Sequence, residues 1–377
     1  MNWLQWTMAA AILPVTVAAA QADEIKVSTA GPITGPYAAF GEQMKRGADM
    51  AVKDINAKGG VLGKQLSLTL GDDACDPKQA RNVANQLADA GVVFVDGHYC
   101  SGSSIPASAV YADNGMLQIS PASTNPALTD DAVKKGWINV FRVCGRDDQQ
   151  GKVAGGYLAT HFKGKPVAII DDKSTYGKGL ADQTRLTLNA DGVKEVLDES
   201  VNAGDKDFSA LVSKMKAAGV AAYFYGGYHT EAGLIARQAK EQGLNAVQIG
   251  GDALATDEYW SITGPAGEGN LMTFTPEPRN MPQAQAVVSE FKQAGYDPEG
   301  YTLFTYAAMQ IFAQAADKAK SVKVDALAKT MHDTKFDTVI GTLGFDAKGD
   351  VIGLGYVVYV WHNGKRVELN PRSASLK

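Results

Sequence analysis

Residues 97–108, GHYCSGSSIPAS, place a histidine, a cysteine and several hydroxyl side chains at the start of a predicted helix. These residue types fit a nucleophile loop, a structural cysteine beside a capped helix, or a cradle for a small anion. Unpaired N–H groups at a helix N-terminus attract a carboxylate. Ser101 adds a donor on a short side chain, and Gly102 permits close approach. We predict an anion site here, with an ordinary helix N-cap as the simpler alternative.

A second hydroxyl-rich stretch follows the next predicted strand. The strand MLQIS is succeeded by PASTNPAL, which offers Ser123 and Thr124. In parallel α/β sheets, ligands lie beyond the carboxyl ends of the strands, so the two stretches can converge on one anion. Each stretch taken alone also fits an N-cap.

Later strands end in groups of a different kind. Tyr176 follows the strand PVAIIDD, Tyr228 follows AAYFYGG, and Asp252 follows VQIGG. An acid that faces donors across a cleft suits a zwitterion, whose ammonium group would lie on Asp252. The alternatives are an N-cap role for Asp252 and positions at the edge of the core for the tyrosines.

Alternating strand-like and helix-like segments position these groups. One series runs from IKVSTAG to MLQIS, and a second runs from PVAIIDD to VQIGG. Two such series predict two α/β lobes, each with a parallel sheet. The hydrophilic segment 144–151 between them is predicted as a hinge, or else as an ordinary surface loop. Helices are predicted over 283–294 and 299–320, followed by an antiparallel ribbon that turns at HNGK.

The bulk composition narrows the class of protein. The chain has 377 residues, 45% hydrophobic and 20% charged, and a net charge of −5. No segment concentrates Lys and Arg, which argues against nucleic acid or an anionic membrane surface as a partner.

The first 22 residues carry no charged side chain, and Met8 to Ala20 is almost wholly apolar. This run is shorter than the ~20 residues that span a bilayer. Ala20 and Ala22 supply the small residues of a signal-peptidase site, so we predict export and cleavage after Ala22. The leader lacks Lys and Arg, and an N-terminal helix that is retained is the alternative. No cysteine follows the cleavage site, so no lipid anchor is expected.

The chain contains three cysteines, Cys75, Cys100 and Cys144. In an oxidising compartment, the two that are 25 residues apart predict a Cys75–Cys100 disulfide. Its closure would stabilise the fold by roughly 3–4 kcal/mol in the chain-entropy model. Cys144 is expected to be free and buried. No metal motif is present, and no metal or organic cofactor is implied.

Several motifs are similar to those of the periplasmic leucine/isoleucine/valine-binding proteins, which serve branched-chain amino acid ABC transporters. They include AVKDINAKGG, GDDACDPKQA, ISPASTNP, AGDKDFSAL and YGGY, and the similarity extends from Asp23 to about Trp361. The resemblance implies a two-lobed type I periplasmic binding protein, α/β in class, with three hinge crossovers. It assigns residues 23–143 and 276–355 to lobe 1, and 144–275 and 356–377 to lobe 2.

The resemblance also implies roles for individual residues. The carboxylate donors fall on Ser101, Thr124 and the backbone of Ala122, beside Ser123. The ammonium partners fall on Tyr228 and Asp252. The side-chain pocket falls on Phe40, Tyr99, Cys100, Tyr176 and Tyr301. The implied partners are a free L-amino acid and an inner-membrane permease, and the protein is expected to be a periplasmic monomer without membrane insertion.

Three residues depart from the leucine-type pattern. Asp252 stands where Glu is usual, Tyr99 where a smaller Leu-like residue is usual, and Phe40 where Trp is common. The shorter acid retracts the carboxylate by ~1.5 Å, about one C–C bond. These changes favour, as an alternative ligand, a small or longer-armed amino acid such as Ala, Pro, Val or γ-aminobutyrate.

Two other functions compete with transport. An exported hydrolase would use His98 with Ser101, but no third orienting group is evident, and a structural role for His98 is preferred. A sensor without a transport role would bind the same ligand and signal through a partner.

Overall fold

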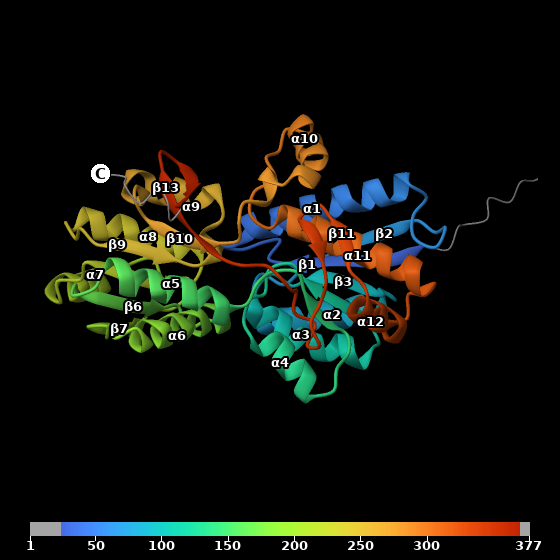
Figure 1. Cartoon of the computed structure of the whole chain (residues 1–377), viewed down its shortest axis with the longest axis horizontal. Helices are drawn as coiled ribbons and strands as arrows, with labels where there is room; N and C mark the ends of the chain where they lie inside the picture. The colour runs from blue at the N-terminus through green and yellow to red at the C-terminus, as the bar shows by residue number, and fades with distance from the viewer. Residues whose placement is uncertain (1–23, 370–377) are drawn as a thin grey trace, which may run out of the picture.

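The computed structural model describes residues 24–369, so the predicted leader lies outside the described residues. Two sheets divide these residues between two lobes that lie side by side (Figure 1). The first lobe contains a parallel sheet in the order β2-β1-β3-β4-β5. Its strands are β1 (Ile25–Gly31), β2 (Leu66–Asp72), β3 (Phe94–Gly97), β4 (Leu117–Ser120) and β5 (Val140–Arg142).

The second lobe contains a sheet in the order β14-β13-β10-β9-β8-β6-β7. Five of its strands pair in parallel: β6 (Val167–Asp171), β7 (Leu197–Ser200), β8 (Ala222–Gly226), β9 (Val247–Gly250) and β10 (Leu271–Phe274). The antiparallel ribbon of β13 (Val357–His362) and β14 (Lys365–Glu368) extends the sheet, as the HNGK turn predicts. A small hairpin of β11 (Phe336–Thr338) and β12 (Gly341–Leu343) belongs to neither sheet.

Helices cover both sheets. Those that precede the first crossover are α1 (Ala38–Ala57), α2 (Pro77–Asp89), α3 (Ser101–Asp113) and α4 (Ala127–Lys134). Those of the second lobe are α5 (Asp147–His161), α6 (Thr175–Ala190), α7 (Ser209–Ala217), α8 (His229–Glu241) and α9 (Asp257–Thr263). The chain then returns to the first lobe with α10 (Gln285–Gln293), α11 (Thr302–Ala319) and α12 (Val324–Asp333). Among residues 24–369, no helix is both long and apolar enough to cross a membrane.

The chain passes between the sheets three times: from β5 to α5, from β10 to α10, and from β12 to β13. The two-lobed α/β architecture is therefore confirmed, while the residues at which each lobe begins and ends stay a prediction. The hydrophilic linker predicted over 144–151 is wrong in part, because α5 begins at Asp147. Cys144 and Asp147 are both buried, so this part of the segment is not an exposed linker.

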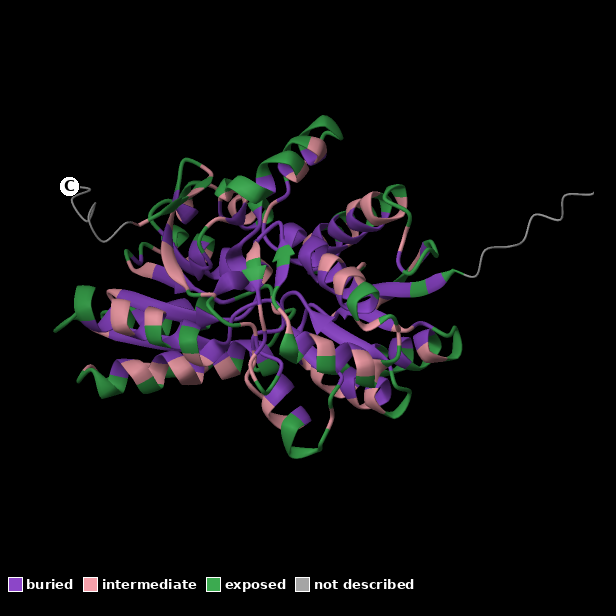
Figure 2. Cartoon of the chain, turned by 45° about the vertical axis from the view of Figure 1, so that its right-hand side comes forward, coloured by how far each residue is buried: buried purple, intermediate pink, exposed green. Residues whose placement is uncertain are grey.

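Local sequence explains how the loops near the cleft are held. Asp76 caps α2 by accepting hydrogen bonds from the N–H groups of Lys78 and Gln79, and Pro77 occupies the first helical position. The central strands β6 and β8 are buried along their whole length, whereas the outer helix faces are exposed (Figure 2). Residues that follow strands of both sheets line one cavity, so the carboxyl ends of the two sheets face each other.

Candidate functional site

A small cavity lies between the two lobes, beyond the carboxyl ends of their strands. In this structure its free volume is about 10 Å³, about enough for one water molecule and far below the roughly 300–1,000 Å³ of pockets for drug-sized ligands. Its lining consists of Tyr99, Ser101, Ala122, Tyr176, Tyr228, Asp252 and Ala253. All of these except Ala253 are residues that the sequence singled out.

The first lobe contributes the N-terminus of α3 and the loop after β4. Cys100 occupies the N-cap position, and Ser101 begins the helix, so the unpaired N–H groups of its first turn face the cleft. The Ser101 hydroxyl accepts a hydrogen bond from the N–H of Asn125 at 3.2 Å, which joins the two predicted stretches. Thr124 is fully buried, and its hydroxyl, which has no closely aligned hydrogen-bond partner within residues 24–369, interacts with the Asp147 carboxylate. The first lobe therefore has hydrogen-bond donors that are available to an anion.

The predicted disulfide is present between Cys75 and Cys100. It ties the start of α3 to the loop that precedes α2, so the donor groups rest on a covalently anchored turn. Cys144 is free and buried, as expected, and burial raises the pKa of its thiol. The Cys144 thiol donates to the carbonyl oxygen of Ser123 at 3.5 Å, so it lies directly behind the loop after β4.

The second lobe contributes Asp252, which follows β9 and is buried. The Tyr176 hydroxyl donates to one carboxylate oxygen at 2.9 Å, and the Tyr301 hydroxyl donates to the other. Burial raises the pKa of Asp252, while the hydrogen bonds from Tyr301 and Tyr176 oppose the rise. Two neutral hydrogen-bond donors offset only part of the cost of burying the Asp252 carboxylate. A ligand ammonium group would supply the opposite charge.

Aromatic rings form the remaining walls. Tyr99 stacks on Phe40 with ring centroids 4.3 Å apart, and it meets Tyr301 edge-on at 5.5 Å. Tyr228 lies between Tyr176 and Tyr37, at 5.2 Å and 4.3 Å. The Tyr99 hydroxyl is buried without a partner among the described residues. Phe40 therefore supports the wall formed by Tyr99 rather than lining the cavity itself.

The Ser123 side chain takes a different direction. Its hydroxyl lies within hydrogen-bond distance of the carbonyl oxygens of His98 and Tyr99, at 3.1 Å and 3.0 Å. It also contacts the Ser104 hydroxyl at 2.5 Å. Ser123 therefore holds the two hydroxyl-rich loops together and does not line the cavity.

Asp147 is a functional candidate that the sequence did not reveal. It is fully buried at the start of α5, and neither carboxylate oxygen has a hydrogen-bond partner of good geometry within the described chain. Burial and the nearby Asp252 raise its pKa to about 8, while the Thr124 hydroxyl opposes the rise. The stretch RDDQQ is typical of an exposed segment, so the sequence around Asp147 gave no indication of its burial.

The lobes contact each other across the cleft. The Tyr37 hydroxyl donates to Glu231 at 3.3 Å, and the Thr230 hydroxyl donates to the carbonyl oxygen of Pro36 at 3.0 Å. The Asn125 amide donates to the carbonyl oxygen of Thr175 at 2.8 Å. With the Tyr301–Asp252 hydrogen bond, these contacts describe a closed arrangement.

His98 is structural, as predicted. It is fully buried, with Nδ1 2.6 Å from an Asp73 carboxylate oxygen and Nε2 2.7 Å from the Tyr111 hydroxyl. Both ring nitrogens are therefore engaged, and neither is left to act as a base for Ser101. The pair that a hydrolase would need is not formed.

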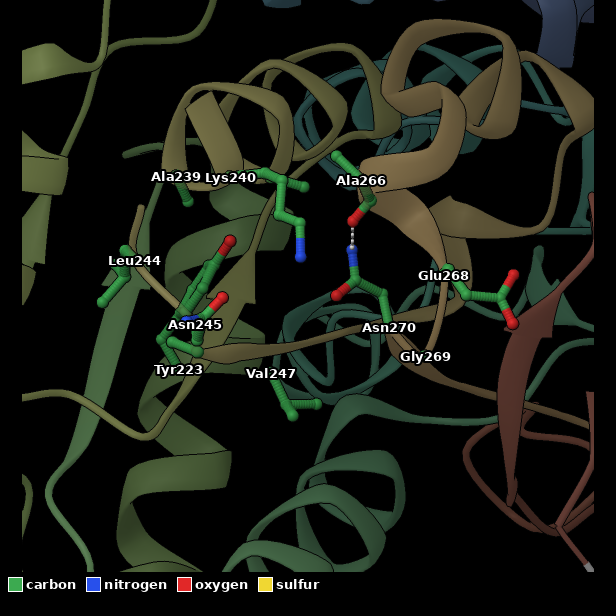
Figure 3. Close-up of a pocket in the computed structure, with 12 residues that line it drawn as sticks. Tyr223, Ala239, Lys240, Leu244, Asn245, Val247, Ala266, Glu268, Gly269 and Asn270 are labelled. Atoms are coloured by element: carbon green, nitrogen blue, oxygen red, sulfur yellow. Dashed lines mark hydrogen bonds between the residues drawn. The ribbon is translucent and has the colours of Figure 1, made fainter. Parts of the chain in front are cut away.

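A larger concavity of about 220 Å³ lies at the opposite end of the second sheet (Figure 3). It begins at Val247 and Asn270, the amino ends of β9 and β10, where Lys240 and Glu268 border it. Ligands of parallel sheets bind at the carboxyl ends instead, so the smaller cavity is the better candidate. Residues 24–369 contain no group of three His, Cys, Asp or Glu side chains that could hold a metal ion.

The chain is similar to proteins of known class along most of its length. A family model described as "Periplasmic binding protein" matches residues 24–365. The "Leu/Ile/Val-binding protein homolog 1" of Brucella suis biovar 1 is 51% identical over 342 residues, which cover 90% of this chain and 91% of that protein. The "Leucine-, isoleucine-, valine-, threonine-, and alanine-binding protein" of Pseudomonas aeruginosa is 43% identical, with the same coverage of both chains.

Solved structures give the same picture of the fold. The leucine-binding protein LivK of Thermotoga maritima superposes with a TM-score of 0.84 at 28% identity, covering 92% of this chain and 99% of that one. The branched-chain amino acid transporter substrate-binding protein LivJ of Streptococcus pneumoniae, solved with isoleucine, gives 0.82 at 28% identity, covering 92% and 100%.

Proposed function

Because the chain belongs to the periplasmic binding protein family, we propose that it is the substrate-binding component of an amino acid ABC transporter, of the branched-chain (Leu/Ile/Val) type. The observation that carries this proposal is the pairing of opposite chemistries across one cavity. Ser101, at the start of α3, lines the cavity on the first lobe, and the buried acid Asp252 lines it on the second. An amino acid zwitterion satisfies both sides at once.

Binding of such a ligand would favour lobe closure. Its carboxylate would accept hydrogen bonds from the α3 N-terminus and Thr124, and its ammonium group would lie against Asp252. A ligand that touches both lobes binds the closed state more tightly than the open one, which shifts the population toward closure. The closed molecule would then present both lobes to a membrane permease.

The side chain of the ligand would lie among the aromatic walls. Relatives named for leucine, isoleucine and valine support a branched-chain ligand, and the Pseudomonas relative is also named for threonine and alanine. The alternative is a small or longer-armed amino acid (Ala, Pro, Val or γ-aminobutyrate), because Tyr99 narrows the cavity and Asp252 has a short side chain. One methylene in an apolar pocket changes affinity by only ~1–3 kcal/mol, so either preference keeps the same class of ligand.

We further propose that the protein acts in the periplasm as a monomer after cleavage following Ala22. The family and the leader pattern support export. Asp23 would be the first residue of the protein recovered from the periplasm, and N-terminal sequencing tests this. Loss of growth on the ligand as sole nitrogen source, after deletion of the protein, would separate a transporter component from a sensor without a transport role.

Isothermal titration calorimetry on unfolded and refolded, ligand-free protein tests the ligand class. The panel consists of Leu, Ile, Val, Ala, Pro, Phe and γ-aminobutyrate. Micromolar or tighter binding of Leu, Ile and Val would support the branched-chain assignment. Tight binding of Ala, Pro or γ-aminobutyrate with weak Leu would favour the alternative, and no binding across the panel would refute the proposal.

The Asp252→Asn variant tests the ammonium position. Removing one partner from a buried charge pair costs about 3–5 kcal/mol, so we expect ligand affinity to fall by that amount. Asp191→Asn, at the exposed C-terminal end of α6, is a matched control that should bind like the wild type. Unchanged affinity in Asp252→Asn would show that the ammonium group lies elsewhere.

A further inference from the structure

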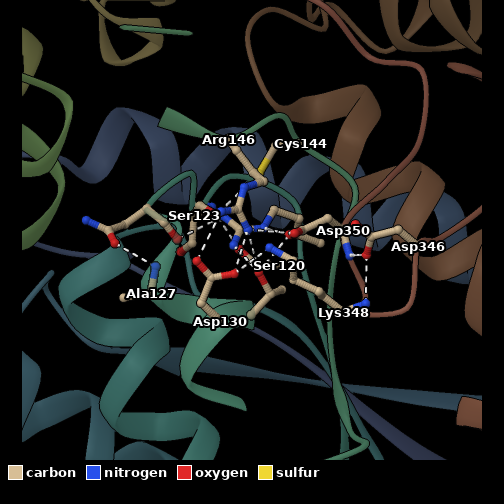
Figure 4. A network of polar contacts seen from close by, with 12 residues as sticks. Ser120, Ser123, Ala127, Asp130, Cys144, Arg146, Asp346, Lys348 and Asp350 are labelled. Carbon is tan, nitrogen blue, oxygen red and sulfur yellow. Dashed lines mark hydrogen bonds and ion pairs between the residues drawn. The ribbon is translucent and has the colours of Figure 1, made fainter. Parts of the chain in front are cut away.

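A buried ionic network lies beside the loop after β4 and reaches two of the three crossovers (Figure 4). Its centre is Arg142, the last residue of β5, which is fully buried. The Arg142 Nε donates to one oxygen of Asp350 at 2.7 Å, and the Arg146 Nη1 donates to the other at 2.7 Å. Arg146 lies in the first crossover, and Asp350 lies in the segment that leads from β12 to β13. The network therefore fastens these two crossovers together.

The other nitrogens of Arg142 hold the loop that flanks the cavity. Its Nη1 donates to the carbonyl oxygens of Ser123 at 2.7 Å and Asn125 at 3.0 Å, and its Nη2 donates to the Thr129 hydroxyl at 2.8 Å. A guanidinium group presents its donors in one rigid plane. The two carbonyl groups on either side of Thr124 are consequently fixed in direction.

Fixing the Ser123 carbonyl also fixes the Thr124 N–H. The two groups belong to one planar trans peptide unit, in which C=O and N–H point in opposite directions. When the carbonyl points at Arg142, the N–H must point away from it. The Thr124 carbonyl oxygen accepts from the Asp147 N–H at 2.9 Å, and the Asn125 N–H donates to Ser101. Within residues 24–369, the Thr124 N–H is the backbone donor of this segment that is left without an acceptor.

The loop that carries Asp350 is itself held closely. The Arg142 N–H donates to the carbonyl oxygen of Gly349 at 3.0 Å. Gly349 has φ +92°, and a Cβ atom there would come within 2.3 Å of the Val140 carbonyl oxygen. Only glycine fits such a conformation and approach. Asp346 accepts from the N–H of Asp350 at 3.0 Å, so the carboxylate that pairs with Arg142 has a defined position.

We propose that Arg142, oriented by Asp350, is a positioning residue for ligand recognition. It sets the direction of the Thr124 N–H toward the ligand carboxylate and ties that donor to the first and third crossovers. The inference rests on the proposed function, since it assigns the ligand carboxylate to the first lobe. It adds that recognition of the carboxylate depends on an ion pair that never touches the ligand.

The test compares two ligands in each of several variants. The probes are L-leucine and L-leucinamide, or the tightest binder of the panel and its carboxamide, with affinities measured by calorimetry. In Asp350→Asn, Arg142 loses its charged partner, and we expect amino acid affinity to fall by about ten- to a hundredfold, as for one hydrogen bond to a charged group. The affinity of the carboxamide should fall by much less, so the ratio of the two affinities drops.

Two further variants make the result decisive. Thr129→Val removes one acceptor of Arg142 but leaves its ion pair with Asp350. It should lower the affinity ratio in the same direction, and it serves as the test if Asp350→Asn does not fold. Glu277→Gln is the matched control, because it breaks the two-point pair of Glu277 with Arg279 (2.8 Å and 2.8 Å) just beyond β10, away from Arg142. Its ratio should equal that of the wild type.

The outcomes separate this inference from the proposed function. Wild-type protein that binds no amino acid refutes the proposed function. Wild-type binding combined with an unchanged affinity ratio in both Asp350→Asn and Thr129→Val overturns only the positioning role. An equal fall in affinity for both ligands would show that the network only stabilises the fold, which also overturns the positioning role.

Discussion

The protonation of Asp147 gives a prediction whose size follows from the structure. The side chain is fully buried, and burial with the nearby Asp252 raises its pKa to about 8, from 3.8 for an unperturbed carboxyl group. Between these two values the folded protein binds a proton that the unfolded chain has released. A raised carboxyl pKa therefore contributes stability that is complete below pH ~4 and is lost as the pH rises through ~8.

The magnitude is about 1.4 kcal/mol per pH unit within that window. Raising the pH from 5 to 7 should therefore cost the ligand-free protein about 3 kcal/mol through Asp147. Asp147→Asn, which resembles the protonated side chain at every pH, should not show this loss. The difference in the free energy of unfolding, variant minus wild type, should grow by about 3 kcal/mol over this interval.

Urea unfolding of ligand-free protein at pH 5, 6, 7 and 8 measures the effect. Asp172, whose pKa is set by other neighbours, contributes equally in both proteins, whereas Asp252 is coupled to Asp147 and its change belongs to the measured difference. Parallel curves for the two proteins would refute the reasoning, because they would show that Asp147 is ionised in the folded state. A variant that becomes relatively less stable at high pH would show that the Asp147 carboxylate is paired.

Two smaller predictions concern the cross-lobe contacts and the anchored turn. Tyr37→Phe removes the hydrogen bond to Glu231 that exists only when the lobes touch, so ligand affinity should fall by about threefold to thirtyfold at unchanged unfolding free energy. Calorimetry and chemical denaturation check the two quantities, and an equal loss of both would contradict the closure argument. Cys75→Ser opens the bridge to Cys100 across 25 residues, and should lower the unfolding free energy by roughly 3–4 kcal/mol. Wild-type stability in urea would be evidence against that contribution.

The parallel lobes were predictable because their signals are local. Strands such as β6 read as short apolar runs, and α2 is marked by Asp76, Pro77 and the glycine after it. The disulfide followed from cysteine count and compartment. The residues lining the cavity followed in part from the rule that ligands lie beyond the carboxyl ends of strands, although the resemblance supplied Tyr99 and Ala122.

The residues that depend on long-range packing were not predictable in the same way. Asp147 belongs to the polar stretch RDDQQ, which does not indicate burial, and Arg142 lies in the apolar strand VFR, which gives no sign of its acidic partner. Arg142 pairs with Asp350 across 208 residues of chain. Ser123 was predicted as a ligand-binding residue, but its hydroxyl donates to carbonyl oxygens of the neighbouring loop and does not line the cavity. Composition gives the polarity of a side chain, whereas its direction depends on which loop packs behind it.

The three crossovers also determine the order in which the lobes can fold. The core of the first lobe needs α11, because Phe94 of β3 stacks on Phe312 with ring centroids 4.5 Å apart. A chain emerging during synthesis reaches Phe312 only after all five parallel strands of the second lobe. The second lobe is built mainly from neighbouring segments, so it has the lower contact order and should fold first. The first lobe remains incomplete until α11 has been made, so the second lobe can complete its parallel strands while the core of the first lobe still lacks Phe312.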